Sequence, residues 1–410
     1  MMKYIILVGD GMADLPVPAL GDRTPLEAAH IPALDAVARH GVVGMYWPIP
    51  EGMPAGSEIG NLSLFGYDPR TTFCGRAPIE AASRRISLAA DQVAFRCNLV
   101  TLEDGVMRDF TAGHITSEEG AAIIASLDAA LSGAGSVRFH PGVSYRHLAV
   151  VTAGPGASVE DLVATDCTPP HNIMDQPHQA YWPQGPAASC VAEIMRQSQG
   201  VLAGHEVNAR RAAAGKLTAT SAWLWGQGTT PAMAPYREKF GVSGAVVSAV
   251  DLVKGLGVLA GLEVIDVPGA TGWIDTNYAG KVAAAMDALS RHDFVYVHVE
   301  APDEAAHQGR ADLKIQAIED FDAKVVAPFL NYVERTGEAR LLVAPDHFTL
   351  LSTKGHYGDA TPFALCGAGV EPIGVAAYSE KEAARTGIEL REGYQLTERL
   401  FREDRIGFRV

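Results

Sequence analysis

Three apolar segments of this chain, far apart in the sequence, are each followed within a few residues by an aspartate. The pairs are residues 4–8 with Asp10, residues 294–299 with Asp303, and residues 340–344 with Asp346. Short runs of apolar, aromatic and β-branched residues are typical of buried strands. Because ligands of open α/β sheets bind beyond the carboxyl ends of the strands, we expect these carboxylates to meet in one site.

Histidines accompany two of these strand ends. His307 follows Asp303 by four residues, so a helix over this segment would place both side chains on one face. His347 comes directly after Asp346, and His356 follows nine residues later. Carboxylate oxygens and imidazole nitrogens are ligands for divalent metal ions. A single Asp–His pair is also consistent with an ordinary surface pair, but the combination of these strand ends predicts a metal site.

The composition limits the classes of protein to which this chain can belong. Its 410 residues are enough for two or three domains with a large core. Hydrophobic residues make up 48% of the sequence and charged residues 20%, which excludes wholesale disorder. The net charge of −15 does not favour nucleic acid as a partner. An enzyme of this charge that acts on an anionic substrate would need positive charge placed locally.

The sequence also bears on redox chemistry and on membranes. Its five cysteines are scattered without a Cys-x-x-Cys motif, so neither a disulfide framework nor a thiolate zinc site is indicated. The apolar run at the N-terminus is too short for a signal peptide. The longest apolar segment, residues 245–262, is interrupted by Asp251 and Lys254, unlike a membrane span. We therefore expect a cytoplasmic protein without a membrane partner.

Ser57 follows a loop rich in glycine and proline and begins a segment with helical apolar spacing. Ile59, Leu62 and Leu64 would face the core from such a helix. Serine is a common N-cap and Glu58 would complement the helix dipole, so the local pattern favours a capping role. The alternative is a nucleophile, because a helix N-terminus favours negative charge and binds phosphate.

A separate domain is expected between the strand ends. From about residue 83 to residue 235, short strands alternate with helices, and all the candidate metal ligands lie outside this run. This alternation of strands and helices indicates an inserted domain with its own core. A glycine and proline cluster at residues 226–232 indicates the linker that ends it. We predict a discontinuous catalytic domain of residues 1–84 and 236–410 and an inserted substrate-binding domain of residues 85–235.

Together, these motifs resemble the alkaline phosphatase superfamily and, more narrowly, the archaeal-type cofactor-independent phosphoglycerate mutases. The resemblance covers nearly the whole chain. The segments that carry it include Gly9-Asp-Gly-Met, Pro54-Ala-Gly-Ser-Glu-Ile-Gly-Asn, Gly75-Arg-Ala-Pro-Ile-Glu-Ala, Asp109-Phe-Thr-Ala-Gly-His-Ile, Gly142-Val-Ser-Tyr-Arg-His, Trp223-Leu-Trp-Gly-Gln-Gly, Asp251-Leu-Val-Lys-Gly, Ala301-Pro-Asp-Glu-Ala-Ala-His and Pro345-Asp-His. The metal and nucleophile motifs are specific for the superfamily, and those of the insertion for this branch.

The resemblance implies an α/β fold, with an alkaline-phosphatase-like sheet sandwiched by helices and an inserted α+β cap domain. It also implies two divalent metal ions. One would be held by Asp303, His307 and His356, and the other by Asp10, Asp346, His347 and Ser57. The mixed ligand set suits Mn²⁺ or Zn²⁺ better than an all-oxygen Mg²⁺ site. The nucleophile interpretation of Ser57 is then favoured, since a metal-bound serine hydroxyl ionises more readily.

The inserted domain would distinguish a mutase from a phosphatase, because a mutase must exclude water and retain the glycerate. By resemblance, the substrate-binding residues of this cap are His114, Arg146, His147 and Arg211. Lys254 would contact the phosphate or a hydroxyl from the catalytic domain, as a second catalytic residue. Each of these residues is also consistent with a solvated turn or a structural ion pair.

The activity implied by the resemblance is interconversion of 2- and 3-phosphoglycerate, a step of glycolysis, through a phosphoserine and without 2,3-bisphosphoglycerate. The substrate would be a small phosphorylated molecule. Close bacterial relatives of this branch are proposed homoserine kinases, and a metal-dependent phosphomonoesterase or phosphodiesterase would keep the same ligands. The sequence has no Gly-x-x-x-x-Gly-Lys-Ser loop, but this superfamily binds phosphate through metals. A non-enzymatic binding module would leave seven metal-type residues unexplained.

Overall fold

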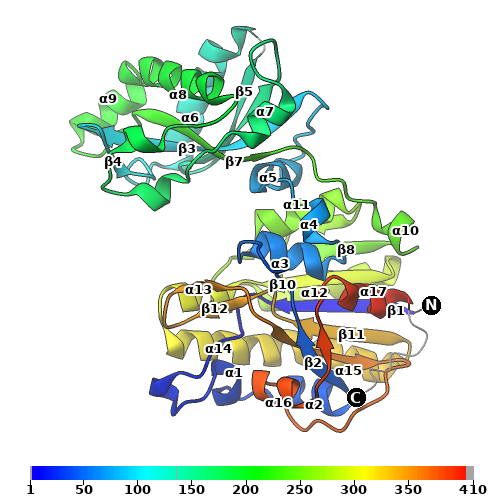
Figure 1. Cartoon of the computed structure of the whole chain (residues 1–410). Coiled ribbons are helices and arrows are strands. Elements are labelled where there is room, and N and C mark those ends of the chain that lie inside the picture. The colour runs from blue at the N-terminus through cyan, green and yellow to red at the C-terminus, as the bar shows by residue number, and fades with distance from the viewer. Residues whose placement is uncertain (1, 135, 403–410) are drawn as a thin grey trace. The chain divides into compact units, whose positions relative to one another are not determined.

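The computed structural model describes residues 2–134 and 136–402, which form two compact units. Unit 1 comprises Met1–Phe73 and Ala232–Val410, and unit 2 comprises Cys74–Pro231 (Figure 1). The sequence analysis placed these boundaries at residues 84/85 and 235/236. The first boundary lies earlier in the structure because helix α5 (Arg76–Ser83) packs Ala77 and Ala81 against Ala94 of unit 2.

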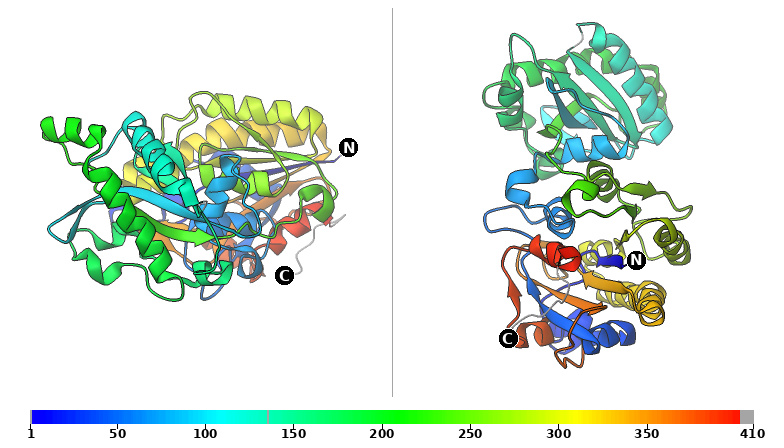
Figure 2. Two further views of the ribbon diagram at one scale, coloured as in Figure 1. Left: turned by 90° about the horizontal axis from the view of Figure 1, so that it is seen from above. Right: turned by 90° about the vertical axis from the view of Figure 1, so that its right-hand side faces the viewer.

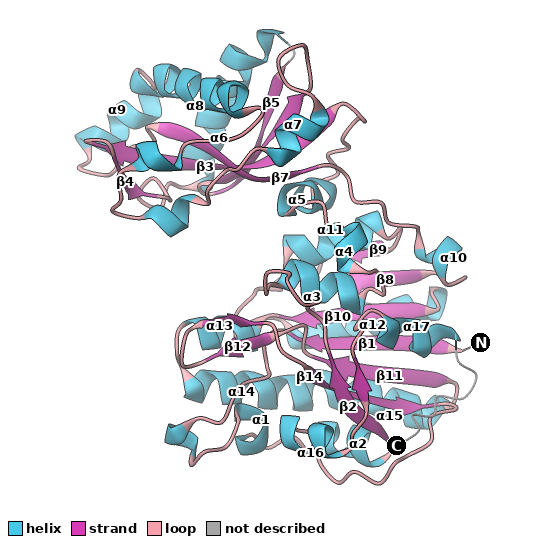
Figure 3. Ribbon diagram, in the orientation of Figure 1, coloured by secondary structure: helices cyan, strands magenta, loops and turns pink. Residues whose placement is uncertain are grey.

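Unit 1 is built on a mixed eight-stranded sheet with the order β15-β2-β14-β11-β1-β10-β8-β9 (Figure 3). Its strands are β1 (Lys3–Gly9), β2 (Gly41–Tyr46), β8 (Gly244–Val247), β9 (Glu263–Ile265), β10 (Phe294–Val299), β11 (Ala339–Ala344), β14 (Thr361–Gly367) and β15 (Glu389–Leu390). β1 pairs in parallel with both β10 and β11, whereas β14 runs antiparallel to β11 and to β2. The predicted strands before Asp10, Asp303 and Asp346 are therefore neighbours at the centre of the sheet.

Helices cover both faces of this sheet. Ile5 and Leu7 of β1 face one core, which they share with α2 (Pro32–Arg39), α12 (Tyr278–Arg291) and α15 (Ala327–Thr336). Figure 2 shows helices on both sides of the sheet of this unit. On the other face, Tyr296 packs on Phe65, directly after α3 (Ser57–Leu64), with ring centroids 4.3 Å apart. Because both faces are buried, the central strands are mostly apolar. The expected α/β fold, with a sheet between layers of helices, is confirmed.

The remaining elements of unit 1 connect and flank this sheet. They are η1 (Pro18–Leu20), α1 (Pro25–Ala28), α4 (Pro69–Thr72), α10 (Tyr236–Lys239), α11 (Asp251–Leu259), α13 (Ala301–His307), α14 (Ala311–Phe321), the π-helical η5 (Asp322–Val326), α16 (Glu380–Arg385) and α17 (Gln395–Arg402). β12 (Phe348–Leu350) and β13 (Gly355–Tyr357) form a separate antiparallel hairpin. In the part of the chain that the structure describes, no helix combines the length and apolar character needed to cross a membrane.

Unit 2 has its own antiparallel sheet, in the order β4-β3-β6-β5 with β7 also paired to β3. The strands are β3 (Gln92–Glu103), β4 (Val106–Asp109), β5 (Val137–Val143), β6 (Arg146–Thr152) and β7 (Ser221–Gly228). The other elements are α5, α6 (Ser117–Leu131), η2 (Ser132–Ala134), α7 (Val159–Ala164), η3 (Pro170–Ile173), η4 (His178–Tyr181), α8 (Ala188–Ala203) and α9 (Glu206–Ala213). Residues of α6 and α8 pack with β3 and β7 into a separate hydrophobic core.

A buried charge network holds the segment after β1. The ammonium of Lys314, on α14, donates to the Asp14 carboxylate at 2.8 Å and to the carbonyl of Thr349 at 2.7 Å. Glu380, at the start of α16, accepts from the backbone N–H of Asp14 at 3.1 Å and from the hydroxyl of Thr24 at 2.7 Å. Burial raises the pKa of the Glu380 carboxyl to about 7, although these hydrogen bonds oppose the rise.

We expect Glu380→Gln to change how stability depends on pH. The raised pKa means that the contribution of the neutral carboxyl is complete below pH 4.5 and is lost as the pH rises through about 7. The free energy of unfolding of the wild-type chain, relative to the variant, should fall by up to about 3 kcal/mol between pH 5 and pH 8. Urea denaturation of both proteins over this range measures the change, and a difference that is independent of pH would contradict it.

A buried guanidinium ties unit 2 together. Arg211, on α9, is 2% exposed and donates to the Glu119 carboxylate of α6 at 2.5 Å. It also donates to the backbone carbonyls of Leu217 at 2.8 Å, Ala112 at 2.8 Å and Gly113 at 3.0 Å. The guanidinium thus connects two helices with the loop after β4, and four of its five N–H donors are used within unit 2.

Arg211→Leu should therefore destabilise unit 2, by about 3 kcal/mol or more, because three backbone carbonyls, at least partly buried, and Glu119 lose their donor. Arg210→Ala is the matched control, since Arg210 is exposed and pairs with Glu206 at 3.6 Å; its effect should stay below about 0.5 kcal/mol. Hydrogen exchange of α6 and α9 reports on both variants. If Arg211→Leu kept the hydrogen-exchange protection of the wild-type chain but lost enzyme activity, Arg211 would instead be a substrate-binding residue.

Candidate metal centre

The parallel pairings of β1 set the position of the predicted ligands. Val8 of β1 is in register with His298 of β10 and with Ala344 of β11. The three strands therefore end together at one edge of the sheet. Asp10 follows β1, α13 follows β10, and Asp346 follows β11 at this edge.

Two glycines allow the backbone to approach closely here. Gly11 has a φ of +57°, and a Cβ at this position would lie 2.3 Å from the hydroxyl of Thr349. Gly60, on α3, faces the loop after β11 so closely that a Cβ would lie 2.1 Å from the carbonyl oxygen of Asp346. Neither position has room for a side chain, so both glycines are needed to bring α3 and the strand ends together.

One group of candidate ligands consists of Asp10, Asp346 and His347. All three side chains are buried, and one potential ligand atom of each lies within 4.8 Å of the others. Nε2 of His347 is 3.5 Å from a carboxylate oxygen of Asp10 and 3.5 Å from one of Asp346. Oδ1 of Asp10 is buried without a hydrogen-bond partner, as expected of an atom that binds a cation.

A second group contains Asp303, His307 and His356. Within α13, Oδ2 of Asp303 lies 3.1 Å from Nε2 of His307, one helical turn later. The β12–β13 hairpin brings His356, on β13, close to α13. Its Nε2 lies 3.4 Å from Asp303 Oδ1 and 3.0 Å from His307 Nε2. His347 joins the two groups, because its ring centroid is 4.1 Å from that of His356 and it also shares a potential ligand set with Asp303.

The carboxylates of this centre repel one another. Burial, followed by the charges of Asp346 and Asp303, raises the pKa of Asp10 well above its usual range. Burial acts in the same direction on Asp303, but hydrogen bonds with His307 and His356 hold its pKa well below the usual range. The hydrogen bond to Asp303 raises the pKa of His307 to about 9. Positive charge is therefore confined to the side of Asp303, whereas Asp10 and Asp346 lie among further carboxylates. The oxygen and nitrogen donors of the cluster fit divalent cations.

Ser57 lies beside this centre. The N-cap of α3 is Gly56 and Ser57 is the first helical residue, so the capping interpretation is wrong. Its Oγ lies 3.1 Å from Nε2 of His347. The hydroxyl is therefore at the N-terminus of an eight-residue helix and within reach of a candidate metal ligand, where a negative charge is stabilised.

Three buried partners of the carboxylates were not identified from the sequence. They are Thr349, whose hydroxyl donates to Asp303 at 2.5 Å; Asn61, which donates to Asp346 at 2.7 Å; and His298, whose Nε2 lies 3.1 Å from Asp10 Oδ2. Spacing was the available signal for two of them. Asn61 is one helical turn after Ser57, and His298 is at the end of β10.

The four predicted substrate-binding residues of unit 2 differ in burial: two are enclosed and two are exposed. His147 is 3% exposed, its Nδ1 accepts from the backbone N–H of Gly142 at 2.9 Å, and burial lowers its pKa to about 3. His147 and Arg211 are both enclosed within unit 2, and their assignment to the substrate stays a prediction. His114 and Arg146 are exposed, with Arg146 5.6 Å from the Tyr145 ring.

Lys254 lies in unit 1, on α11. Its ammonium donates to the Asp266 carboxylate at 2.7 Å, and the side chain is 20% exposed. It is close enough to Lys281 of α12 for its charge to contribute to lowering the pKa of Lys281, to about 8, although burial is the larger cause. Because Lys281 donates to the backbone carbonyl of His298 at 3.1 Å, Lys254 is also near the strand end of β10.

A cluster of basic side chains in unit 2 was not predicted. The guanidinium carbon of Arg96 lies 4.2 Å above the Trp225 ring, and Glu80 pairs with both Arg96 at 3.1 Å and Arg76 at 3.0 Å. Burial, then the charges of Arg96 and Arg76, lowers the pKa of His171. The charge of Arg146 also acts on Arg96. This basic cluster, Arg76, Arg96 and Arg146, carries three positive charges against the single negative charge of Glu80.

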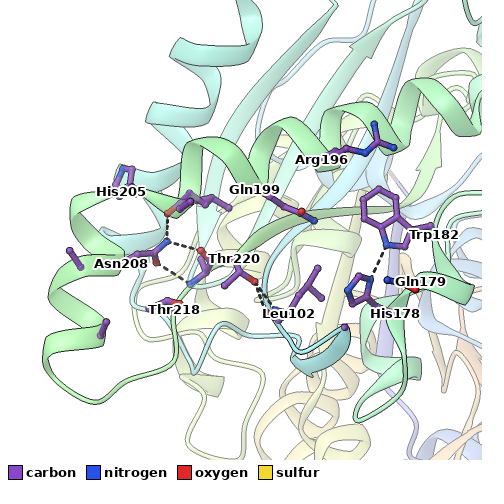
Figure 4. Close-up of a pocket in the computed structure, with 17 residues that line it drawn as sticks. Leu102, His178, Gln179, Trp182, Arg196, Gln199, His205, Asn208, Thr218 and Thr220 are labelled. Atoms are coloured by element: carbon purple, nitrogen blue, oxygen red, sulfur yellow. Dashed lines mark hydrogen bonds between the residues drawn. The ribbon is translucent and has the colours of Figure 1, made fainter.

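Unit 2 also encloses a cavity of about 1020 Å³ between α8, α9 and the loop at η4 (Figure 4). Its polar side chains are largely paired with the protein. Trp182 Nε1 donates to His178 Nδ1 at 2.9 Å, and the Asn208 amide donates to the Leu202 carbonyl at 2.9 Å. None of the predicted site residues lines this cavity, so its size does not mark the reactive site.

Comparisons with known proteins agree with this geometry. Residues 38–208 match the family model of 2,3-bisphosphoglycerate-independent phosphoglycerate mutase. A relative of that name from Methanothrix thermoacetophila is 51% identical over 96% of this chain and 98% of its own length. The solved structure of PH0037 protein from Pyrococcus horikoshii has a TM-score of 0.80 and 28% identity, covering 99% of both chains.

A second solved structure is the cofactor-independent phosphoglycerate mutase from Thermoplasma acidophilum. It has a TM-score of 0.68 and 29% identity and covers 98% of this chain and 99% of its own. Because the similarity to the Methanothrix relative covers 96% of the chain, it extends over both units. The chain therefore belongs to the archaeal-type family of 2,3-bisphosphoglycerate-independent phosphoglycerate mutases, which are isomerases.

Proposed function

We propose that this chain interconverts 3-phosphoglycerate and 2-phosphoglycerate through a phosphoserine at Ser57, beside two divalent metal ions. The observation that carries the proposal is the position of the Ser57 hydroxyl, 3.1 Å from His347, the residue that joins the two groups of candidate ligands. A nucleophile at this point has a carboxylate and imidazole cluster on one side and a helix N-terminus on the other.

The residues present fit two ions. Asp303, His307 and His356 would hold one, and Asp10, Asp346 and His347 would hold the other, with the Ser57 hydroxyl. Support comes from the unpartnered Oδ1 of Asp10 and from the excess of buried carboxylates. When bound, the ions would lower the pKa of the serine hydroxyl and stabilise charge on the transferring phosphoryl group. The mixed donors favour Mn²⁺ or Zn²⁺ over Mg²⁺.

The protein residues supply the covalent step. Ser57 Oγ loses its proton and attacks phosphorus in line with the ester oxygen. The phosphorus–oxygen bond to the glycerate then breaks, and that oxygen takes up a proton. In the second half, the other glycerate hydroxyl loses its proton and attacks the phosphorus of the phosphoserine. The bond between phosphorus and Ser57 Oγ breaks, and Ser57 Oγ takes up a proton. Substrate and product differ only in which hydroxyl carries the phosphate, and no second phosphate donor is needed.

We propose unit 2 as the substrate-binding cap, with the basic cluster as its anion-binding part. Arg96 is held by Glu80 and stacked on Trp225, so its orientation is set before an anion arrives. Exposed Arg146 and His114 would add adaptable donors. A guanidinium can bind the glycerate carboxylate through two parallel hydrogen bonds and keep the dephosphorylated glycerate while it turns. Lys254 would bind the phosphate from unit 1.

Ser57→Ala should reduce mutase activity by several orders of magnitude, because it removes the atom that accepts the phosphoryl group. The variant should keep its stability to within about 0.5 kcal/mol, since Ser57 is not the helix cap. Three activities of both proteins are measured and compared: turnover of 3-phosphoglycerate, phosphorylation of homoserine with ATP, and hydrolysis of a chromogenic phosphate ester. If the wild-type chain preferred either alternative substrate, the mutase proposal would be wrong. If Ser57→Ala remained active, the proposed phosphoserine intermediate would be wrong.

Arg146→Ala tests the proposed cap. Loss of a charge-assisted hydrogen bond should raise KM for 3-phosphoglycerate about tenfold and increase released inorganic phosphate relative to isomerised product. Arg138→Ala is the matched control, because Arg138 lies on the neighbouring strand β5, is also exposed and pairs with Asp128. Equal effects of the two variants on both rates would show that the Arg146 guanidinium does not retain the glycerate.

A further inference from the structure

Asp346 is connected to the interior of unit 1 through a chain of two side chains. The Tyr296 hydroxyl donates to Oδ1 of Asn61 at 2.6 Å, and Nδ2 of Asn61 donates to Oδ2 of Asp346 at 2.7 Å. All three residues are 0% exposed. We propose that Tyr296 and Asn61 are a positioning pair, which holds Asp346 in its metal-binding orientation and joins it to the nucleophile.

The Asn61 amide is fixed in one of its two orientations. A neutral tyrosine hydroxyl has one proton to donate, so it selects the carbonyl oxygen of Asn61 and leaves the NH₂ group for Asp346. The reverse orientation would place an amide oxygen against a carboxylate oxygen in a buried site. Burial, with an added contribution from Asp346, raises the pKa of Tyr296 well above its usual range, so the hydroxyl keeps its proton.

The pair also determines which lone pairs of the Asp346 carboxylate remain available to a metal ion. Oδ2 accepts from Asn61, whereas Oδ1 accepts only a longer hydrogen bond, of 3.2 Å, from the backbone N–H of Gly11. His347 Nε2 lies 3.5 Å from Oδ2. With Oδ2 engaged on one side by the amide, the carboxylate plane cannot rotate freely, and its remaining lone pairs stay directed towards the centre.

Asn61 makes a second contact that links the metal ligand to the nucleophile. Its Nδ2 donates to the backbone carbonyl of Ser57 at 2.9 Å as well as to Asp346. One NH₂ group therefore spans the first turn of α3 and the loop after β11. Gly60 permits this spacing, since any side chain there would meet the Asp346 backbone. Removing the pair should disturb both metal binding and the position of Ser57 relative to the metal ligands.

Metal titration of the full chain tests this inference, which rests on the two-metal site proposed above. The chain is first stripped with a chelator and then titrated with Mn²⁺ in a calorimeter. The wild-type chain should bind two ions. Tyr296→Phe should weaken one of the two sites about tenfold and leave the other within twofold, because only the fixed orientation of Asn61 is lost. Asn61→Leu should weaken the same site by about tenfold to a hundredfold.

Tyr378→Phe is the matched control, since Tyr378 is an equally buried tyrosine of unit 1 whose hydroxyl donates to a backbone carbonyl, that of Pro362, at 2.9 Å. It should bind Mn²⁺ as the wild-type chain does. If Asn61→Leu does not fold, Tyr296→Phe alone decides, because it retains the packing of the ring on Phe65. At saturating Mn²⁺, Tyr296→Phe should recover most of its kcat, while Asn61→Leu should not, because its link to Ser57 is also lost.

The possible failures can be told apart. A wild-type chain that binds no Mn²⁺ after chelation would overturn the two-metal proposal and with it the positioning role. Two wild-type sites, with both affinities unchanged in Tyr296→Phe and in a folded Asn61→Leu, would overturn only the positioning role. A loss of affinity in Tyr378→Phe as large as in Tyr296→Phe would also overturn it, because the effect would then follow from any lost buried hydroxyl.

Discussion

The repulsion between buried carboxylates is the interaction on which this structure depends. Asp10, Asp303 and Asp346 are each no more than 5% exposed and close enough for their charges to act on one another. Such a cluster is unfavourable unless positive charge or hydrogen-bond donors compensate it. The imidazoles of His307 and His356 compensate Asp303, and the unpartnered oxygen of Asp10 shows where compensation is incomplete. The chemistry of the centre follows from this deficit, which divalent cations would fill.

Each of the three carboxylates also has a partner that is not a candidate ligand. Thr349 donates to Asp303, Asn61 donates to Asp346, and His298 lies beside Asp10. Such partners orient a carboxylate before a cation arrives and reduce the reorganisation that binding requires. They belong to the sheet, to α3 and to the β12–β13 hairpin, so the orientation of the ligands depends on the packing of the whole unit.

The arginines of unit 2 differ in how deeply they are buried and in the groups with which they pair. Arg211 is enclosed by Glu119 and three carbonyls, and its role in this structure is to join α9, α6 and a loop. Arg96 is held from one side by Glu80 and Trp225. Arg146 is exposed at the start of β6. A guanidinium that already uses four of its five N–H donors within the protein is a poor ligand for an anion. Burial and pairing thus distinguish Arg211 from the arginines proposed to bind substrate.

The sequence by itself determined the architecture of unit 1 and most of its reactive centre. Apolar runs predicted β1, β10 and β11, and the aspartates behind them had to meet once those strands paired in parallel, because parallel strands end at one edge. The four-residue spacing of Asp303 and His307 predicted their contact on a helix. These inferences succeeded because they depend on local spacing and on the direction of strands, both of which can be read from a sequence.

Only the tertiary structure decided the rest. Whether Ser57 caps its helix depends on the backbone of Gly56 and on the distance to His347, 290 positions away in the chain. Whether Arg211 is open to a substrate depends on Glu119 of another helix. Asn61, Thr349 and His298 gained their roles from carboxylates that are far from them in sequence. Burial and long-range hydrogen bonding arise when distant segments pack, and no local pattern encodes them.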